Sequence, residues 1–450
     1  MKFVCFRSCL VYLVLVFGLF ACKRDNVPDP GHVPLISEPA ALRIASGNDA
    51  AVAVSWYQLQ LKLIKETGGF TPPVAARAIA YTGITLYEAV VWGADGASLK
   101  GQLNGLHYVP VPERGKKYNW TIAANSAMAV ITKNLFPNAS AANVALITQL
   151  EIDNLEALSD SCAQEEIIRS VNYGRQVAGS IYQWSATDGG KDGYLNTFPS
   201  DYVPPVGAGL WVPTPPLFQP AMLPYWGNNR PIVKPVTPDQ AGILPPAYST
   251  DTTSVFHHEA FFVYHTGITL TPEENLIAKY WADGGGTFTP PGHLIAITAQ
   301  LISEQHLSLS AAAKLFAQVG ISLNDAGILC WKYKYRYNVL RPVTYIRSNI
   351  DSSWLPLIGT PPFPSYISGH ATFTSAAGHI LSAYFGDGFS FTDKQKVPEG
   401  FAPRFFNSFA GMTDEAAISR VYGGIHYRFD SEVGKQVGEN IAERVLALRY

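Results

Sequence analysis

Charged side chains are scarce in this sequence: Asp, Glu, Lys and Arg make up 15% of its 450 residues, and the formal net charge is −2. So little charge beside 47% hydrophobic residues argues against a disordered chain. It also argues against a nucleic-acid binder, because such proteins need a concentrated positive surface. The sequence therefore predicts a globular protein with a sizeable core and no polyanionic partner.

The N-terminus has the pattern of an export signal. Lys2 and Arg7 precede an apolar run at 10–21, which leads directly to Cys22. The run is too short for a comfortable bilayer span, and the small residue before Cys22 resembles the lipobox of bacterial lipoproteins. An uncleaved signal anchor is the alternative, but no basic stop-transfer cluster follows. We therefore expect residues 1–21 to be a lipoprotein signal peptide and Cys22 to be lipidated.

Cysteine is rare, with five residues in the whole chain. Beyond Cys22 only Cys162 and Cys330 remain, and their helical neighbours favour buried thiols over a disulfide framework. Residues 22–39 contain several prolines and suit a tether. These features predict an exported cell-envelope lipoprotein, periplasmic or anchored to the outer membrane, that touches the membrane only through its lipid.

Long strand patterns are also missing, and helical patterns dominate the remaining chain. Nothing alternates long enough to make more than a hairpin, and the sequence has no repeat of fixed period and no low-complexity tract. Apolar residues instead recur at three-and-four spacing, which predicts helices with one buried face. The ranges are 40–66, 73–92, 120–135, 140–158, 165–184, 272–281, 293–303, 310–340, 368–385 and 414–450. The predicted fold class is all-α, a helical bundle.

Residues 186–250 interrupt the helical pattern. Pro, Gly, Tyr and Trp are dense there and periodicity is absent, which predicts a long ordered loop packed over the mouth of the bundle. A domain linker is the alternative, but linkers rarely carry so many aromatic residues. We therefore expect a single domain at 40–450, with N-terminal helices at 40–185 and site-bearing helices at 251–450.

The first candidate site motif is the basic stretch that begins at Lys334. Lys334 and Arg341 are seven residues apart, so on one helix both side chains project from the same face. Pro342 is expected to end that helix. Since Lys332 and Arg336 lie in the same stretch, a solvated basic face is the alternative for this motif alone.

The second motif is Ser368-Gly369-His370, which opens a predicted helix after a proline-rich turn. Free backbone N–H groups gather at such a helix start and bind anions. Gly369 permits close approach, the Ser368 hydroxyl can donate, and His370 supplies an acid or base that titrates near neutrality. An ordinary N-cap serine beside an incidental histidine is the alternative.

The third motif contains Arg420, His426 and Asp430. Arg420 and His426 are six residues apart, and Gly423-Gly424 between them allows the helix to break so that both can face one pocket. Asp430 can accept the second ring proton of His426 and so fix its tautomer. The alternative is an ordinary surface pair at a flexible helix end.

In combination, Lys-x6-Arg-Pro, Ser-Gly-His and Ser-Arg-x5-His-x3-Asp resemble the signature shared by vanadium-dependent haloperoxidases and the type 2 phosphatidic acid phosphatase superfamily. The resemblance implies the two-bundle helical fold of vanadium chloroperoxidase and vanadate as cofactor. It makes His426 the vanadium ligand and His370 the acid-base residue. The residues that it assigns to the vanadate oxygens are Lys334, Arg341, Ser368, Gly369 and Arg420.

The same pocket serves two chemistries. A haloperoxidase uses vanadate, hydrogen peroxide and a halide (iodide, bromide or chloride) to make a hypohalous species that halogenates a small organic acceptor. An acid phosphatase instead forms a phosphohistidine at His426, and His370 protonates the leaving alcohol. Segments 280–293, 72–77 and 86–89 resemble haloperoxidase relatives and favour the first reading. No pattern in the sequence indicates an oligomeric state.

The resemblance extends to residues around the central motifs. It makes Asp283 the support of the acid-base histidine; the alternative is that Asp283 caps a turn. Phe363 stands where haloperoxidases vary between an aromatic residue and a histidine, and Trp331 and Lys332 are halide-side candidates at the entrance. We expect two further histidines to be structural, His293 and His379, because single histidines in helices are mostly satisfied by local hydrogen bonds.

Overall fold

The structure of the chain is a computed structural model that describes residues 50–450 apart from 95, 161 and 235–243. The expected signal peptide, the tether with Cys22, and the first ten residues of the helix predicted at 40–66 lie outside the described residues. The described residues all belong to one compact unit.

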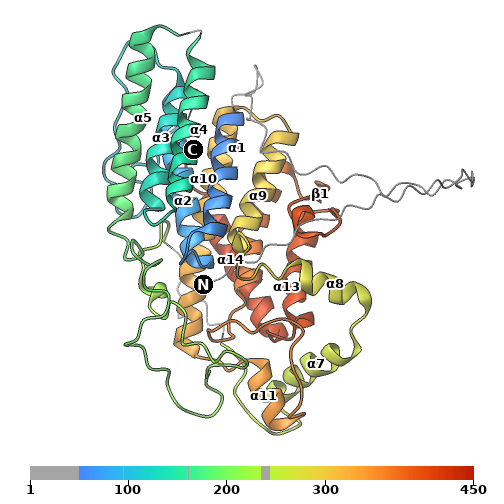
Figure 1. Cartoon of the computed structure of the whole chain (residues 1–450). Helices are drawn as coiled ribbons and strands as arrows, with labels where there is room; N and C mark the ends of the chain where they lie inside the picture. The colour runs from blue at the N-terminus through green and yellow to red at the C-terminus, as the bar shows by residue number, and fades with distance from the viewer. Residues whose placement is uncertain (1–49, 95, 161, 235–243) are drawn as a thin grey trace, which may run out of the picture. The chain divides into compact units, whose positions relative to one another are not determined.

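The N-terminal part of this unit is built of helices close to those predicted. They are α1 (Ala50–Glu66), α2 (Pro72–Val90), the short 3₁₀ helix η1 (Val91–Gly93), α3 (Trp120–Leu135), α4 (Ala141–Ser159) and α5 (Gln164–Ser185). Asn119 and Ser140 begin α3 and α4 because their side chains accept the backbone N–H three residues on. Helices α3, α4 and α5 lie side by side (Figure 1).

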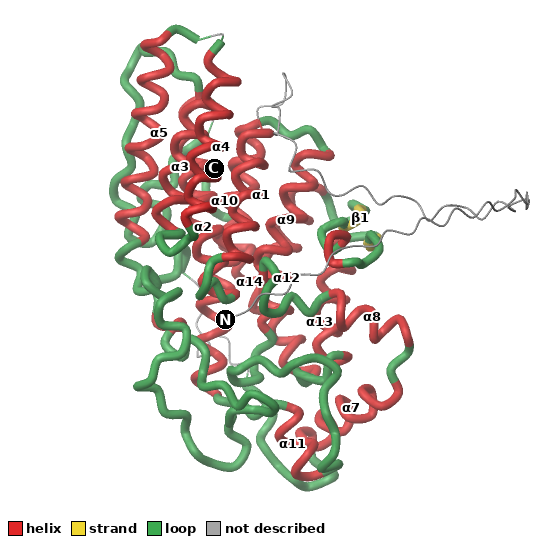
Figure 2. The backbone as a smooth tube through the Cα atoms, viewed as in Figure 1, coloured by secondary structure: helices red, strands yellow, loops and turns green. Residues whose placement is uncertain are grey.

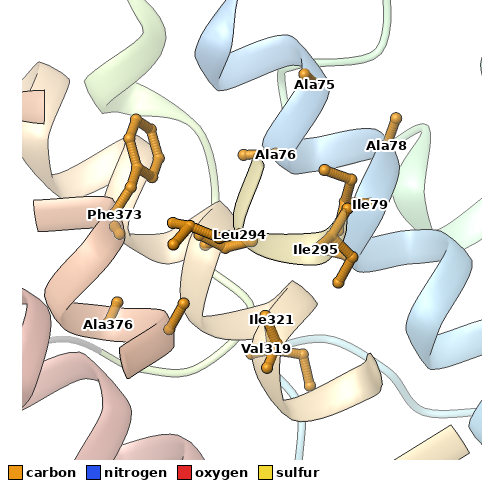
Figure 3. Close-up of a cluster of buried hydrophobic side chains, with 14 of the residues drawn as sticks. Ala75, Ala76, Ala78, Ile79, Leu294, Ile295, Val319, Ile321, Phe373 and Ala376 are labelled. Carbon is orange, nitrogen blue, oxygen red and sulfur yellow. The ribbon is translucent and has the colours of Figure 1, made fainter. Parts of the chain in front are cut away.

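Helix α2 is the centre of the core. Every residue from 73 to 90 is buried, and the helix packs along α10 (Leu309–Tyr337). With η1 it is long and apolar enough to cross a membrane, but its apolar window is wholly buried inside the protein, so we assign it as a core helix. Figure 3 shows Ile79 of α2 beside Ile295 of α9, in a cluster to which Val319 of α10 and Phe373 of α12 also belong.

Residues 186–234 and 244–254 form the long loop that the sequence predicts, apart from the 3₁₀ helix η2 (Trp226–Asn228) (Figure 2). The loop is tied to the end of α10, where Trp211 N donates to the Asn338 carbonyl at 2.6 Å. Midway along α10, the buried Asp325 carboxylate accepts the N–H groups of Ile232 and Val233, both at 2.8 Å. The described part of this segment is therefore an ordered layer, which confirms the loop prediction.

The C-terminal half supplies the remaining elements. Its helices are α7 (Val255–Thr269), α8 (Pro272–Tyr280), α9 (Thr289–Glu304), α10, α11 (Pro342–Asn349), α12 (Gly369–Phe385), α13 (Phe409–Tyr422) and α14 (Arg428–Leu446). Strands β1 (Phe391–Asp393) and β2 (Arg404–Phe406) pair antiparallel, with the 3₁₀ helix η3 (Val397–Glu399) between them. Helix α12 packs against α10, α13 and α14.

Within the described residues, the sequence pattern missed two α-helices and placed the end of α10 too late. The sequence pattern overlooked α7, which is apolar on nearly all sides and so lacks a stripe, and the short α11. Helix α10 ends at Tyr337 because Asn338 adopts a left-handed conformation with φ of 47°. Pro342 then begins α11 instead of ending the preceding helix. Lys334 and Arg341 therefore do not share a helix face.

Candidate active site

The three sequence motifs meet in the interior, although each lies at a helix end. Lys334 comes from the last turn of α10, Arg341 and Ser368 are the N-cap residues of α11 and α12, and Arg420 lies in the last turn of α13. His426 follows in the turn before α14. All five are at most 2% exposed, so the structure gathers buried cations around one imidazole.

His426 is a neutral imidazole, and one of its two ring nitrogens is hydrogen-bonded to a carboxylate. Its Nδ1 lies 2.8 Å from Asp430 Oδ2, as the sequence predicts, and its Nε2 lies 3.1 Å from Arg341 Nη1. An arginine can only donate, so Nε2 is the acceptor and Nδ1 carries the proton, a tautomer assigned from these partners. Burial, together with the charges of Arg341 and Lys334, lowers the pKa of His426. Its Nε2 is thus the unprotonated nitrogen, and a ligand that binds there would displace the hydrogen bond from Arg341 Nη1.

Arg341 is buried but only partly satisfied. Its Nε donates to the Phe363 carbonyl at 2.8 Å and its Nη1 to the Ile425 carbonyl at 2.7 Å, whereas Nη2 is buried without a partner. Burial lowers its pKa to about 10, which leaves the guanidinium charged at neutral pH. Burying an N–H group of a cation without a hydrogen-bond acceptor costs free energy of folding, and a bound anion would supply that acceptor.

Lys334 is engaged by backbone on all its donors. Its Nζ donates to the carbonyls of Pro364, Ser365 and Ile367 at 2.9, 3.0 and 2.6 Å. An ammonium has three hydrogens, so a direct bond to an oxyanion must replace one of these contacts. Burial lowers the pKa of Lys334. In this arrangement Lys334 fixes the turn before Ser368 and adds positive charge to the pocket.

The start of α12 supplies backbone donors. Ser368 accepts from Ala371 N at a long 3.5 Å, so the first N–H groups of the helix are weakly capped. A Cβ placed on Gly369 would meet its nearest protein atoms only at 3.9 Å. Space therefore remains beside the helix N-terminus, where backbone dipoles favour an anion.

Arg420 and His370 lie on the side of the pocket formed by the end of α8. Arg420 Nη2 donates to the Ala278 carbonyl at 3.0 Å, and burial lowers its pKa to about 10. His370 is hydrogen-bonded to the Trp281 carbonyl, and its Nε2 is buried without a partner. Burial and the charge of Arg420 lower the pKa of His370. His370 is thus a neutral imidazole with one open nitrogen.

Asp283 acts on His370 through its charge, which opposes the lowering of the pKa of that imidazole, while the hydrogen bonds of Asp283 go to other residues. Its Oδ2 lies 3.0 Å from His293 Nδ1 and its Oδ1 lies 2.5 Å from Lys396 Nζ. His293 Nε2 in turn lies 2.8 Å from Asp393 Oδ2. Both carboxylate oxygens of Asp283 therefore bind cations, and the Trp281 carbonyl is the hydrogen-bond acceptor of His370.

His293 has the structural role that the sequence analysis expected, within a buried ion cluster. Burial alone would lower its pKa, but Asp283 and Asp393 raise the pKa to about 9, so the ring is an imidazolium. The charge and hydrogen bond of His293 lower the pKa of Asp283 despite its burial. His379, in contrast, is partly exposed on α12, with Nδ1 at 4.0 Å from Glu439.

The three halide-side candidates differ in position. The Phe363 ring centroid lies 4.8 Å from Lys334 Nζ and 4.9 Å from the Arg341 guanidinium carbon, so Phe363 borders the cations. Trp331 is buried behind it, with ring centroids 5.0 Å apart. Lys332 is exposed on the outside of α10. A Cβ on Gly369 would lie 3.9 Å from Trp331 Cζ3, so the buried indole also borders the start of α12, and its place at an entrance stays a prediction.

The open groups of this pocket suit an oxyanion. The charges of Lys334, Arg341 and Arg420 all act on His426. Asp430 lies near Lys334 and Arg341, whereas the carboxylate near Arg420 is Asp283, which His293 and Lys396 already bind. Arg341 Nη2 and His370 Nε2 are buried donors or acceptors without a partner. Across the part of the chain that the structure describes, no three His, Cys, Asp or Glu side chains gather as a divalent cation would require. Vanadate fits this set of groups because its oxygens accept from cations and its metal accepts an imidazole.

The fold and the site together define a helical protein with a buried cationic pocket for a tetrahedral oxyanion. Comparison with known proteins agrees: a solved bacterial vanadium-dependent iodoperoxidase is 34% identical, with a TM-score of 0.78 over 88% of this chain and 95% of that one. A family model described as the VCPO second helical-bundle domain matches residues 314–449. The chain therefore belongs to the vanadium-dependent haloperoxidase family.

More distant relatives match over shorter stretches. Vanadium chloroperoxidase of Curvularia inaequalis is 27% identical in a match that covers 37% of this chain and 38% of that protein. Vanadium-dependent bromoperoxidase of Corallina pilulifera is 27% identical over 33% of this chain and 27% of its own length. The chain thus spans less than half the length of these curated relatives. A holo-type bacterial chloroperoxidase, at 17% identity and a TM-score of 0.62 over 84% of this chain and 93% of that one, shares the fold.

Sequence reasoning missed several residues that organise the site. Ser365 lies inside the second motif yet was not singled out, although it contacts Asp430. Asp393 and Lys396 hold His293 and Asp283 from the β1 region, more than 90 residues away in the chain. No local spacing signals such distant pairs. Only Ser365 could have been found from the sequence, because its hydroxyl lies within the second motif.

Replacing His293 with Gln is expected to destabilise the fold by about 3–5 kcal/mol, because removal of one partner leaves buried charges uncompensated. Chemical denaturation measures this loss, and His379→Gln on the surface is the matched control, expected within about 0.5 kcal/mol of wild type. A His293→Gln protein as stable as the wild type would contradict the ion cluster.

The pH dependence of stability provides a second test of the same ion. The pKa of His293 is raised from 6.5 to about 9 in the folded protein. Its stabilisation is therefore fully present below about pH 6.5 and is lost as the pH rises through about 9. Wild type, but not His293→Gln, should lose stability across this interval.

Proposed function

We propose that the protein is a vanadate-dependent haloperoxidase that oxidises a halide with hydrogen peroxide to a hypohalous species. The observation that carries the proposal is the neutral His426 whose Nε2 faces buried cations with open donors. Family membership supports the same chemistry. Iodide is the first halide to test, because the relative that is 34% identical is described as an iodoperoxidase. Bromide, chloride and a small organic acceptor follow from the same family.

The residues of the pocket divide the work between binding and proton transfer. His426 offers Nε2 to vanadium, and the guanidinium groups of Arg341 and Arg420 balance the charge of the oxygens. Ser368, Gly369 and the start of α12 add neutral donors. Bound vanadate supplies the Lewis-acidic centre at which hydrogen peroxide is activated towards the halide.

His370 is the group placed to move protons. Its Nε2 is open, and its other ring nitrogen is held by the Trp281 carbonyl. Because its pKa is lowered by burial and by Arg420, the free ring is a base at neutral pH. A doubly or triply negative oxyanion in the pocket would offset the charge of Arg420 and raise the basicity of His370.

The decisive assay supplies purified protein with vanadate, hydrogen peroxide and iodide or bromide. We expect vanadate-dependent halogenation of a phenolic dye and little hydrolysis of nitrophenyl phosphate. The rival is an acid phosphatase that works through a phosphohistidine at His426, since cationic clamping also serves phosphoryl transfer. Strong phosphatase activity without halogenation would overturn the proposal in favour of that enzyme.

Variants of the two histidines separate their roles. His426→Ala should abolish vanadate retention because the nitrogen ligand is lost, whereas His370→Ala should retain vanadate and mainly lower turnover, by about 100-fold or more. Vanadium analysis after dialysis measures retention, and the dye assay measures turnover. Normal vanadate binding in both variants would contradict the assigned roles.

We further propose that the protein is an exported lipoprotein of the cell envelope, attached through Cys22. The apolar run at 10–21 and the prolines of 22–39 support this proposal. One or two lipid chains on such a tether would hold the enzyme at a membrane surface.

The Cys22→Ser variant tests the anchor. The wild-type protein should fractionate with membranes and carry a lipid-modified Cys22 as its first residue in mass spectrometry. The variant should lose the lipid and leave the membrane fraction, with unchanged haloperoxidase activity because Cys22 lies far along the chain from the site residues. A wild-type chain that keeps residues 1–21 would exclude the lipoprotein.

A further inference from the structure

Ser365 has no role in the reaction described so far, yet its side chain reaches the ligand-binding histidine. The residue is fully buried, and its Oγ donates to Asp430 Oδ2 at 2.5 Å. The same Oγ lies 3.4 Å from His426 Nδ1. We infer that Ser365 is a positioning residue that fixes the orientation and tautomer of His426 through Asp430. The inference rests on the proposed function, since the ligand of His426 is vanadate.

The hydrogen bonds of Asp430 are unevenly divided between its two oxygens. Oδ2 accepts from His426 Nδ1 at 2.8 Å, from Ser365 Oγ at 2.5 Å and from Tyr427 N at 3.2 Å, whereas Oδ1 is buried without a partner. The carboxylate is therefore anchored through one atom. The Tyr427 contact is the longest of the three, so the hydroxyl of Ser365 is the main constraint on Asp430 besides the imidazole itself.

Ser365 is itself rigidly placed. Its backbone N donates to the Val339 carbonyl at 2.9 Å, and its own carbonyl accepts from Lys334 Nζ at 3.0 Å. The residue thus joins the turn before α12 to the end of α10 and to the third motif. Because these two contacts fix the backbone of Ser365, its hydroxyl has a defined position from which it can orient Asp430, and Asp430 in turn orients His426.

The consequence concerns which nitrogen of His426 faces the pocket. A donor bond from Nδ1 to Asp430 leaves Nε2 unprotonated, and Arg341 Nη1 approaches that nitrogen at 3.1 Å. If Asp430 turned away, Nε2 could take the proton and the imidazole would repel the metal and both arginines. Partners that hold a ligand histidine in this way typically contribute about 10–100-fold to metal affinity.

Removal of the hydroxyl tests the inference. In Ser365→Ala the vanadate dissociation constant, measured by equilibrium dialysis with vanadium analysis, should rise about 10-fold or more. Ser322→Ala is the matched control, because Ser322 is also a fully buried serine and its Oγ donates to a backbone carbonyl, Val319 O, within α10. That control should stay within about twofold of wild type and unfold at a similar temperature.

A double-mutant cycle distinguishes positioning from a general loss of structure. Asp430→Asn alone should weaken vanadate binding, and Ser365→Ala should add little in the Asp430→Asn background, because both act through one contact. Additive losses, or a Ser365→Ala protein that binds vanadate like the wild type, would overturn the inference. Failure of the wild type itself to bind vanadate would instead refute the proposed function.

The tautomer can also be measured without any variant of Ser365. In apo-protein with ¹⁵N-labelled histidine, the His426 ring, assigned by its absence in His426→Gln, should show a protonated Nδ1 and an unprotonated Nε2. A wild-type ring protonated at Nε2 would overturn the inference even if Ser365→Ala failed to fold. In a folded Ser365→Ala protein the two tautomers should be mixed.

Discussion

The burial of several cations around one imidazole is the constraint on which the rest of the structure depends. A charged group loses its hydration in the interior and must regain polar contacts there. Lys334, Arg341 and Arg420 regain them chiefly from backbone carbonyls, such as those of Pro364 and Ala278, and to a small extent from carboxylates. Carbonyls lessen the cost of burial without neutralising the charge, so the pocket remains attractive to an anion.

This use of carbonyls explains why the site lies at helix ends. Inside a helix each carbonyl accepts from its own helix and has little to offer a side chain, whereas turns leave carbonyls free. Asn338 ends α10 in a left-handed conformation, and Gly424, with φ of 76°, separates α13 from the turn that carries His426. The apolar packing of α2 against α10, and of α12 against α10, holds these chain reversals in fixed positions (Figure 3).

The sequence predicted what local spacing can encode. The helices from 120 to 185 were placed to within one or two residues, and the break at Gly423-Gly424 and the bond between His426 and Asp430 were foreseen. Relations between distant segments were not foreseen: Arg341 was placed on α10, and the ion pairs of Asp283 with His293 and Lys396 were not predicted. The hydrophobic periodicity of a helix shows which face is buried, but not which element packs against that face. Asp393, for example, is 100 residues from His293, to which it is hydrogen-bonded.

Two groups of buried charges lie close together in this core, and their difference separates structure from function. In the cluster of Asp283, His293, Asp393 and Lys396, both cations are paired with carboxylates, and Glu399 adds a third carboxylate on Lys396. In the pocket, Lys334 and Arg341 lie near Asp430, Arg420 donates to a backbone carbonyl, and Arg341 Nη2 has no partner. Selection for a stable core alone would pair the cations in both places. The pocket keeps its excess of positive charge because an anionic ligand compensates it.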